Sequence, residues 1–196
     1  YLKNLWYIMI KEIENSIISS ADSIKQSTNE SKNISKTIDV IVNCLKNGSK
    51  LVLFGNGGSA ADAQHIAAEF IGRFKLERNS YPAISLTTDS SILTSLSNDY
   101  SYDIIFSRQC ESLVSSDDVV IGISTSGNSK NVELGLKTSK QKGAVTIGLL
   151  GCNGGRIKDI VDISIIVDSN ETAQIQENHR VIYHIICKFV ENLLNN

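Results

Sequence analysis

The stretch from Leu51 to Phe70 constrains the fold most, because it has the pattern of a strand, a tight turn and a helix in immediate succession. Four apolar residues open it, the glycine-rich turn Gly55–Ser59 follows, and an alanine-rich segment typical of a helix completes it. Such a turn presents backbone N–H groups where an anion or a sugar oxygen can bind. On the helix, His65 and Glu69 lie one turn apart on one face. We therefore expect a polar-ligand site with a proton-transfer or metal site beside it.

Further apolar runs alternate with helical patterns along the rest of the chain. Together with the run that opens at Leu51, they predict five strands, at residues 51–54, 83–86, 118–123, 144–150 and 163–167. Continuous apolar runs are typical of parallel strands covered on both faces, so the sequence predicts an α/β three-layer sandwich with a five-stranded parallel sheet. Ligands bind such sheets beyond the carboxyl ends of the strands, where the turns 55–59 and 124–129 are expected.

Apolar residues recur at helical spacing before the first strand, so residues 2–47 are interpreted as two helices with a break at 27–31. Later helices are expected to begin near Thr88–Asp89, at Tyr102, after the 124–129 turn, at Arg156 and at Thr172, with Asn98–Asp99 in a loop. We expect one domain over 1–196, with a helical pair at 1–47 and an α/β core at 48–196. The long first helix suits packing within the domain and a subunit interface equally.

The amino-acid composition narrows the classes of function that this chain could have. The chain is 41% hydrophobic and 20% charged, with a formal net charge of −2, so it has no overall basic field for nucleic acid. It contains no apolar run as long as a membrane span, and the apolar run near its start lacks the pattern of a signal peptide. The four cysteines are far apart in sequence and form no C-x-x-C pair. Free thiols in a reducing cytoplasm are therefore expected.

The loop Ser124–Ser129 carries four hydroxyl side chains between a buried strand and a helix N-terminus. Hydroxyl groups, backbone N–H groups and the helix dipole together favour a phosphate. The alternative is a polar loop in which Asn128 or Ser129 caps the helix. A cap needs one such residue rather than four, which favours the phosphate site.

The glycine turn also matches the dinucleotide fingerprint G-x-G-x-x-A, beginning at Gly55. A dinucleotide site needs an acidic residue at the end of the next strand, about 20 residues further on. Glu77 lies in a charged loop with no strand before it, and Asp89 comes too late. We therefore expect no nucleotide cofactor, and the alternative is a turn that needs glycine only for its geometry.

Gln176 and His184 on the last helix could join His65 and Glu69 as Zn²⁺ ligands, or the set could divide into acid and base. Eight helical residues rise about 12 Å, so Gln176 and His184 do not easily reach one ion from one regular helix. A loosened first turn or a subunit boundary would resolve this. His184 could instead be a satisfied core histidine, and His179, between Asn178 and Arg180, is interpreted as a surface residue.

Six motifs in this order resemble the phosphoheptose isomerases of the sugar isomerase (SIS) domain superfamily. They are G-N-G-G-S-x-x-D-A-x-H-x-x-x-E at 55–69, Y-P-A-I at 81–84, N-D-Y at 98–100, I-F-S-R at 105–108, G-I-S-T-S-G-N-S at 122–129 and I-Q-E-x-H at 175–179. The resemblance implies a flavodoxin-like SIS domain and an aldose–ketose isomerase that converts sedoheptulose 7-phosphate to D-glycero-D-manno-heptose 7-phosphate, for heptose in a surface polysaccharide. It also implies a homotetramer with sites built between subunits, which would ease the 12 Å difficulty.

The same resemblance assigns roles to residues. It implies Glu69 and His184 as base and acid, and a Zn²⁺ site of His65, Glu69, Gln176 and His184. It assigns the substrate to Asn56, Gly57, Gly58, Ser59, Glu69, Asn98, Asp99, Ser124, Thr125, Ser126, Ser129 and Gln176. Many relatives carry arginine where this chain has Gln174, so a cation near the site is missing.

Two alternatives from other functional classes remain. Some relatives of the family are tetrameric regulators that bind the bacterial replication initiator protein without catalysis; retention of Glu69 and His184 argues against that class here. A sensor domain that only binds a sugar phosphate is the other alternative, and these 196 residues contain no fused DNA-binding segment that would favour it.

Overall fold

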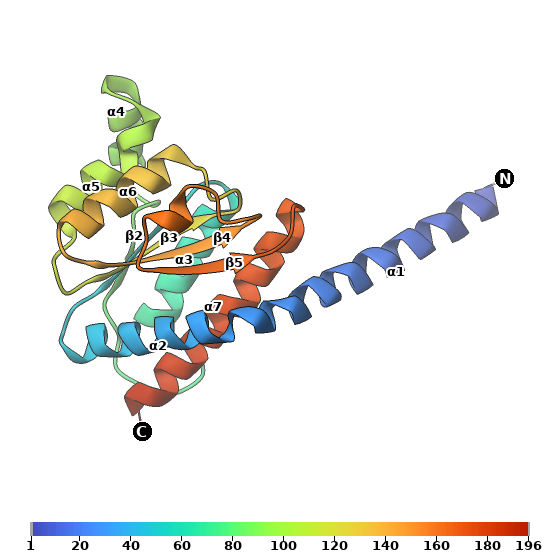
Figure 1. Ribbon diagram of the computed structural model, residues 1–196, viewed down its shortest axis with the longest axis horizontal. Helices are drawn as coiled ribbons and strands as arrows, with labels where there is room; N and C mark the ends of the chain where they lie inside the picture. Colours follow the sequence, from blue (N-terminus) through green and yellow to red (C-terminus); the bar gives the residue numbers. More distant parts are fainter. Residues whose placement is uncertain (1, 196) are drawn as a thin grey trace.

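The computed structural model describes residues 2–195, with side chains for residues 6–195; Tyr1 and Asn196, the ends of the expected domain, lie outside the described residues. Figure 1 shows a sheet between two layers of helices, with one long helix extending away from them. The strands are β1 Leu51–Gly55, β2 Ala83–Ser85, β3 Val119–Ser124, β4 Val145–Gly151 and β5 Ile163–Val167. The α-helices are α1 Leu2–Gln26, α2 Ser31–Lys46, α3 Gly58–Ile71, α4 Ser90–Asp99, α5 Ile105–Leu113, α6 Lys130–Gln141 and α7 Thr172–Asn195, and the 3-10 turns are η1 Ser27–Glu30, η2 Tyr102–Ile104 and η3 Ile157–Asp159.

The five strands pair in the order β2-β1-β3-β4-β5, and every pair is parallel. The prediction of a five-stranded parallel sheet is confirmed. Leu51 of β1 aligns with Ala83 of β2 on one side and with Val119 of β3 on the other. Because the chain leaves β1 for one edge and later returns to its other side, the winding direction reverses between β1 and β3. A crevice for a ligand is expected at the carboxyl ends of these two strands.

Alternating side chains of the strands supply the two cores. Leu51 and Leu53 of β1 face a core shared with α2, α3 and α7, whereas Val52 and Phe54 face a second core shared with α5 and α6. Both cores exclude water, as the fully buried strand β1 shows. The sheet is therefore covered on both faces, as its continuous apolar runs predicted (Figure 1).

The N-terminal helices divide into two parts with different surroundings. As predicted, one break at η1 separates α1 from α2, and Gly48, with φ +78°, follows the end of α2. The last third of α1 packs on α7, whereas its N-terminal part extends away from the domain in Figure 1. Apolar side chains along that extension are exposed: Trp6, Tyr7, Ile8, Met9, Ile13, Ile17 and Ile18. Packing within the domain thus accounts only for the C-terminal part of α1.

The loop prediction for Asn98 and Asp99 is wrong, since both residues lie in the last turn of α4. Their weak helix propensity costs little there, because Tyr100 and Ser101 both donate backbone N–H groups to the Leu96 carbonyl and complete the turn. The predicted cap at the other end of α4 is confirmed, because the Asp89 carboxylate accepts from the Ile92 N–H at 2.9 Å.

The surface interpretation of His179 is also wrong, because its side chain is 0% exposed. Its polar neighbours also contact other helices: buried Asn178 bonds to Ser23 of α1 and Ser27 of η1, and exposed Arg180 pairs with Asp62 of α3. His179 Nε2 lies 3.0 Å from the Leu150 carbonyl, to which it donates. Burial lowers the pKa of His179 to about 4.

Candidate active site

The turn after β1 begins the site at the winding reversal. Gly57 has φ +56°, a conformation that strains other residues. Across the crevice, the amides of Asn56 and Asn131 exchange two hydrogen bonds of 2.8 and 3.0 Å. Tyr102 donates a third, of 2.9 Å, to Asn56 Oδ1. The predicted substrate residue Asn56 is therefore fixed between β1, α6 and η2.

The hydroxyl loop after β3 forms the other wall. Ser129 occupies the cap position of α6, yet its side chain makes no capping hydrogen bond; its Oγ lies 3.0 Å from Ser124 Oγ. Ser126 accepts from the Asn128 N–H, and Gly127, at φ +64°, packs against the Gly154 carbonyl with no room for a Cβ. The capping alternative is therefore wrong for Ser129. Its hydroxyl remains at the N-terminus of α6, where an anion is favoured.

Three predicted residues come together on α3 and α7. One ligand atom each from His65, Glu69 and His184 lies within 4.8 Å of the others. His65 Nε2 is 3.0 Å from Glu69 Oε1, and the His65 and His184 ring centroids are 5.2 Å apart. All three side chains are half-buried. A single chain thus assembles the carboxylate and both imidazoles without a neighbouring subunit.

The donor chemistry of this cluster fits Zn²⁺. Two imidazoles and one carboxylate form a ligand set that catalytic zinc uses, with a further position left for water or substrate. Their mutual separations within 4.8 Å allow one ion to contact all three after small side-chain rotations.

Burial and a neighbouring imidazole set the charge of His184. Loss of water lowers the pKa of His184, and His65 lowers it further, while the Glu69 carboxylate opposes both effects. His184 is therefore a neutral imidazole at neutral pH, with one nitrogen able to accept a proton or bind a metal.

Gln176 lies at the end of the candidate site that is formed by the glycine turn. Its side-chain amide lies against Gly58, at the start of α3, where a Cβ would collide with it. His184, two turns further along α7, lies beside His65 and Glu69. Gln176 therefore contacts the glycine turn, and its place as a fourth Zn²⁺ ligand stays a prediction.

The remaining predicted substrate residues differ in their positions. Ser59 is buried, with its Cβ close to Gly55, and Thr125 is half-buried in the hydroxyl loop. Asn98 donates to Asp99 at 2.8 Å, and both are exposed near the end of α4, a helix that projects from the domain in Figure 1. The structure does not bring Asn98 and Asp99 into contact with the His65 cluster.

Sequence reasoning missed the side chains that hold His65 from behind. Tyr183 Oη lies 3.1 Å from His65 Nδ1 and 3.4 Å from Asp62 Oδ1, and Arg180 bonds to both Tyr183 and Asp62. Burial raises the pKa of Tyr183 to about 12, so its hydroxyl keeps its proton. Asp62 precedes His65 by three residues, which places both on neighbouring turns of one helix face. That spacing was the available signal.

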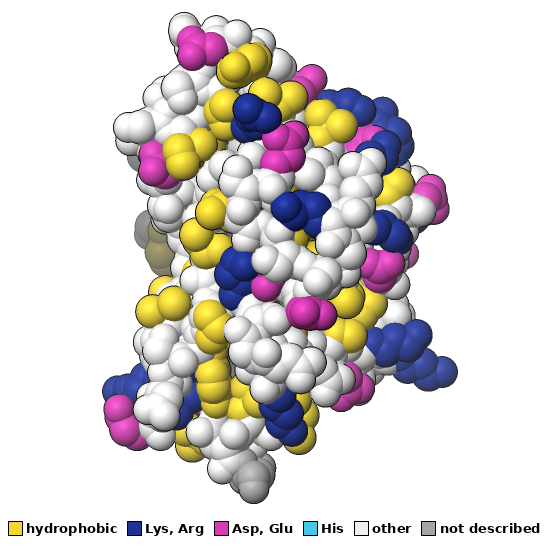
Figure 2. Space-filling model, turned by 90° about the vertical axis from the view of Figure 1, so that its left-hand side faces the viewer, with side chains coloured by type: hydrophobic (Ala, Val, Ile, Leu, Met, Phe, Trp, Pro, Cys, Tyr) yellow, Lys and Arg dark blue, Asp and Glu magenta, His cyan; other side chains and the backbone are white. Residues whose placement is uncertain are grey.

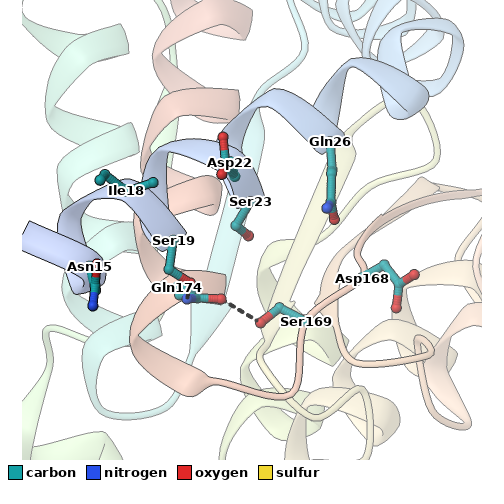
Figure 3. Close-up of a pocket in the computed structure, with 9 residues that line it drawn as sticks. All are labelled: Asn15, Ile18, Ser19, Asp22, Ser23, Gln26, Asp168, Ser169 and Gln174. Carbon is teal, nitrogen blue, oxygen red and sulfur yellow. Dashed lines mark hydrogen bonds between the residues drawn. The ribbon is translucent and has the colours of Figure 1, made fainter. Parts of the chain in front are cut away.

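Gln174, the residue that departs from the family pattern, lies away from the His65 cluster. Figure 3 shows Gln174 in a pocket of about 380 Å³ between α1 and the start of α7. Gln174 accepts from Ser169 at 3.1 Å and donates to Ser19 at 2.9 Å. It thus ties α1 to the loop before α7, whereas Gln176 faces α3.

Two properties of the molecule concern nucleic-acid and membrane partners: the charges on its surface and the apolar content of its helices. On the face shown in Figure 2, Lys and Arg side chains are interspersed with Asp and Glu, and they form no continuous basic area there. Among the helices of residues 2–195, none has the length and apolar content to cross a membrane.

Comparisons with known proteins identify the family of the chain. The SIS domain family model matches residues 16–151. A phosphoheptose isomerase from Citrifermentans bemidjiense is 55% identical over 161 residues, covering 82% of this chain and 84% of its own. One from Geotalea daltonii is 50% identical over 187 residues, covering 95% and 97%.

Solved structures of phosphoheptose isomerases also resemble this chain. The phosphoheptose isomerase of Neisseria gonorrhoeae superposes with a TM-score of 0.89 at 35% identity, covering 94% of this chain and 99% of its own. The one from Francisella tularensis has a TM-score of 0.90 at 32% identity, covering 93% and 98%. These relatives favour the enzyme over the regulatory and sensor alternatives. The chain is an isomerase that belongs to the SIS domain family and, within that family, to the phosphoheptose isomerases.

Proposed function

We propose that this sugar-phosphate isomerase interconverts sedoheptulose 7-phosphate and D-glycero-D-manno-heptose 7-phosphate through an enediol. The observation that carries the proposal is the meeting of Glu69, His65 and His184 within 4.8 Å in one chain. Aldose–ketose isomerisation moves a proton between adjacent carbons, so it needs a base near carbon and a proton donor near oxygen. The Glu69 carboxylate beside the neutral His184 imidazole supplies both groups.

Glu69 is the base in this proposal, and His184 moves protons on the substrate oxygens. The Glu69 side chain is 20% exposed, which leaves it open to a substrate while water is partly excluded. A neutral His184, with its pKa lowered by burial, can accept a proton from one oxygen and return it to the next.

The hydroxyl loop binds the substrate phosphate in this proposal. The Ser124 and Ser129 hydroxyls and the N-terminus of α6 converge beyond β3, next to the Asn56 turn. Fixing the phosphate there holds the reacting carbons in register with Glu69, which is an entropic contribution to catalysis.

We assign Zn²⁺ to His65, Glu69 and His184, with Gln176 as the fourth ligand that the family resemblance implies. The donor set and its close approach support this assignment. When bound, Zn²⁺ would polarise a carbonyl oxygen as a Lewis acid. A metal-bound carboxylate is a poorer base, so Glu69 would not serve as zinc ligand and as base at the same time. No nucleotide cofactor takes part.

We further propose a homotetramer in the cytoplasm that supplies heptose for a surface polysaccharide, with no nucleic-acid or membrane partner. The exposed apolar side chains of α1 support self-association. All four cysteines are free thiols, which fits a reducing compartment.

Product analysis by NMR tests the activity. Incubation with sedoheptulose 7-phosphate should give the aldose phosphate, and chelation of Zn²⁺ should reduce the rate until Zn²⁺ is restored. Binding of the sugar phosphate by folded protein, without any product, would instead identify a binding protein.

A further inference from the structure

A buried polar chain lies behind the proposed zinc cluster. It runs from Asp62 through the Tyr183 hydroxyl to His65 Nδ1, with separations of 3.4 and 3.1 Å. Asp62 and Tyr183 are each 2% exposed, so bulk water does not compete for these contacts. The 3.4 Å separation is long for an O–H···O bond, but Arg180 donates to both oxygens, at 3.2 Å to Asp62 and 3.1 Å to Tyr183. The three groups are therefore held as one unit.

Two proton arrangements are compatible with this geometry. In one, the neutral His65 ring carries its proton on Nε2 and donates to Glu69, while Nδ1 accepts from Tyr183. In the other, His65 Nδ1 carries the proton and donates a hydrogen bond to the Tyr183 oxygen, while the Tyr183 hydroxyl donates its own hydrogen bond to Asp62. The 3.0 Å contact between Nε2 and the Glu69 carboxylate favours the first arrangement, because it needs a proton between the two atoms. Only the second arrangement leaves an electron pair on Nε2 that can bind a metal ion.

Asp62 favours the second arrangement. An ionised carboxylate can only accept hydrogen bonds, so it draws the Tyr183 proton toward itself. The Tyr183 oxygen is then an acceptor toward His65, which favours a proton on Nδ1. Without the Tyr183 hydroxyl, Nδ1 loses its polar partner in the buried region and the proton is better placed on Nε2, against Glu69.

We propose that Asp62, acting through the Tyr183 hydroxyl, stabilises the His65 tautomer with its proton on Nδ1 against the opposing contact of Nε2 with Glu69, and thereby makes Nε2 available as a zinc ligand. This inference rests on the zinc site of the proposed function. Asp62 and Tyr183 are positioning residues, since they act through His65 and do not belong to the ligand set themselves.

Zinc affinity of the purified full chain gives the first test. Tyr183→Phe removes the hydroxyl but keeps the ring that packs edge-on against His65 and His184. Competition with a chromophoric chelator should show a Kd for Zn²⁺ roughly 10- to 100-fold weaker in Tyr183→Phe, the usual effect of losing such a partner. Asp62→Asn should weaken binding in the same direction. Tyr81→Phe is the matched control, because Tyr81 Oη contacts only Asn195 among the described polar partners, and its Kd should equal that of the unmodified chain.

The position of the proton gives the second test, and it needs no zinc. In zinc-free protein at about pH 8, where an ordinary histidine is neutral, long-range ¹H–¹⁵N NMR distinguishes the two His65 tautomers. The fraction of the tautomer with its proton on Nδ1 should be equal in the unmodified chain and Tyr81→Phe and smaller in Tyr183→Phe, where only the Glu69 contact acts on the proton.

The outcomes separate the two proposals. An unchanged tautomer and an unchanged Kd in Tyr183→Phe overturn the role of Asp62 and Tyr183. If Asp62→Asn does not fold, Tyr183→Phe alone decides. If the unmodified chain binds no Zn²⁺, the zinc assignment is wrong, and the tautomer measurement still decides whether Tyr183 positions the proton.

Discussion

Glu69 carries the chemical step in the proposed mechanism, so its loss should affect turnover more than binding. In Glu69→Gln the side chain keeps its shape but cannot take a proton. We expect kcat at saturating Zn²⁺ to fall by roughly 10²- to 10⁴-fold, the contribution usual for general base catalysis, with little change in the Kd for the sugar phosphate. Steady-state kinetics and calorimetry measure the two quantities.

Glu77→Gln is the matched control, because the Glu77 side chain is 91% exposed and lies outside the cluster. Near-normal kcat in Glu69→Gln would remove Glu69 from the mechanism.

The hydroxyl loop is tested by Ser124→Ala/Ser126→Ala. Hydrogen bonds to a charged group contribute about 1.5–3 kcal/mol each, so KM for the phosphorylated sugar should rise by roughly tenfold or more. Ser115 is an exposed serine just before β3, so it lies at the end of the sheet where the strands begin, opposite the hydroxyl loop. Ser115→Ala should therefore leave KM unchanged. An unchanged KM in the double variant would locate the phosphate elsewhere.

His179 predicts how stability depends on pH. Its folded-state pKa of about 4 lies below the ordinary value of 6.5, so between these values only the unfolded chain takes up the proton. Stability therefore falls as pH drops through this window and is unaffected by His179 above it. Between pH 7.5 and 5 this residue should cost about 2 kcal/mol.

Urea unfolding at both pH values checks this, with His179→Gln as the comparison. The drop in stability should be about 2 kcal/mol smaller in the variant, because glutamine does not titrate. Equal drops in the two proteins would mean that His179 does not remain neutral in the fold.

Two helices position the cluster, and an ion pair joins α7 to the segment that follows α3. The Arg78 and Glu191 side chains are each 2% exposed and are joined at 3.0 Å. Glu191 also accepts from the backbone of the segment after α3, which brings Phe74 within 5.7 Å of the His184 ring. Arg78 donates in addition to the Glu69 carbonyl at 2.8 Å. The end of α3 is thereby fixed against α7, so that Glu69 and His184 stay together.

A polar ladder joins α1 and η1 to α7. Ser19, Ser23 and Ser27, four residues apart, bond to Gln174 and Asn178, also four residues apart. Asn178→Ala would leave the buried Ser23 hydroxyl and the half-buried Ser27 hydroxyl without this partner, so we expect a loss of about 1–3 kcal/mol of stability in urea unfolding.

Asn170→Ala, in the exposed loop before α7, is the control and should stay within about 0.5 kcal/mol. If Asn178→Ala is as stable as the control, the ladder does not hold α1 on the domain.

We expect the extension of α1 to form the subunit interface of the proposed tetramer. Ile13 and Ile17 lie four residues apart and are 52% and 65% exposed, on the part of α1 that projects in Figure 1. Such an apolar row is typical of a protein interface. Ile13→Glu/Ile17→Glu should therefore lower the mass measured by analytical ultracentrifugation below that of the proposed tetramer.

Leu113→Glu serves as the control, since Leu113 is an exposed apolar residue at the end of α5. A tetramer that persists in the double variant would show that the projecting part of α1 is not the subunit interface.

The order of strands and helices was predictable because each depends on residues close in sequence. Apolar runs such as Val119–Ser124 need both faces covered, and a glycine turn such as Gly55–Ser59 joins a strand to a helix by local geometry. The pairing of His65 with Glu69 likewise follows from helical spacing. These local patterns determined the fold class and several of the candidate residues.

Only the tertiary structure decided which distant residues meet. His65 and His184 are 119 positions apart, and their contact depends on how α3 and α7 pack against one face of the sheet. The same packing buried His179 between polar neighbours and placed Tyr183 of α7 behind His65, which no local spacing could specify. The reason is physical: hydrogen-bond geometry along a helix acts over four residues, whereas burial depends on which surfaces complement each other in volume and polarity across the fold.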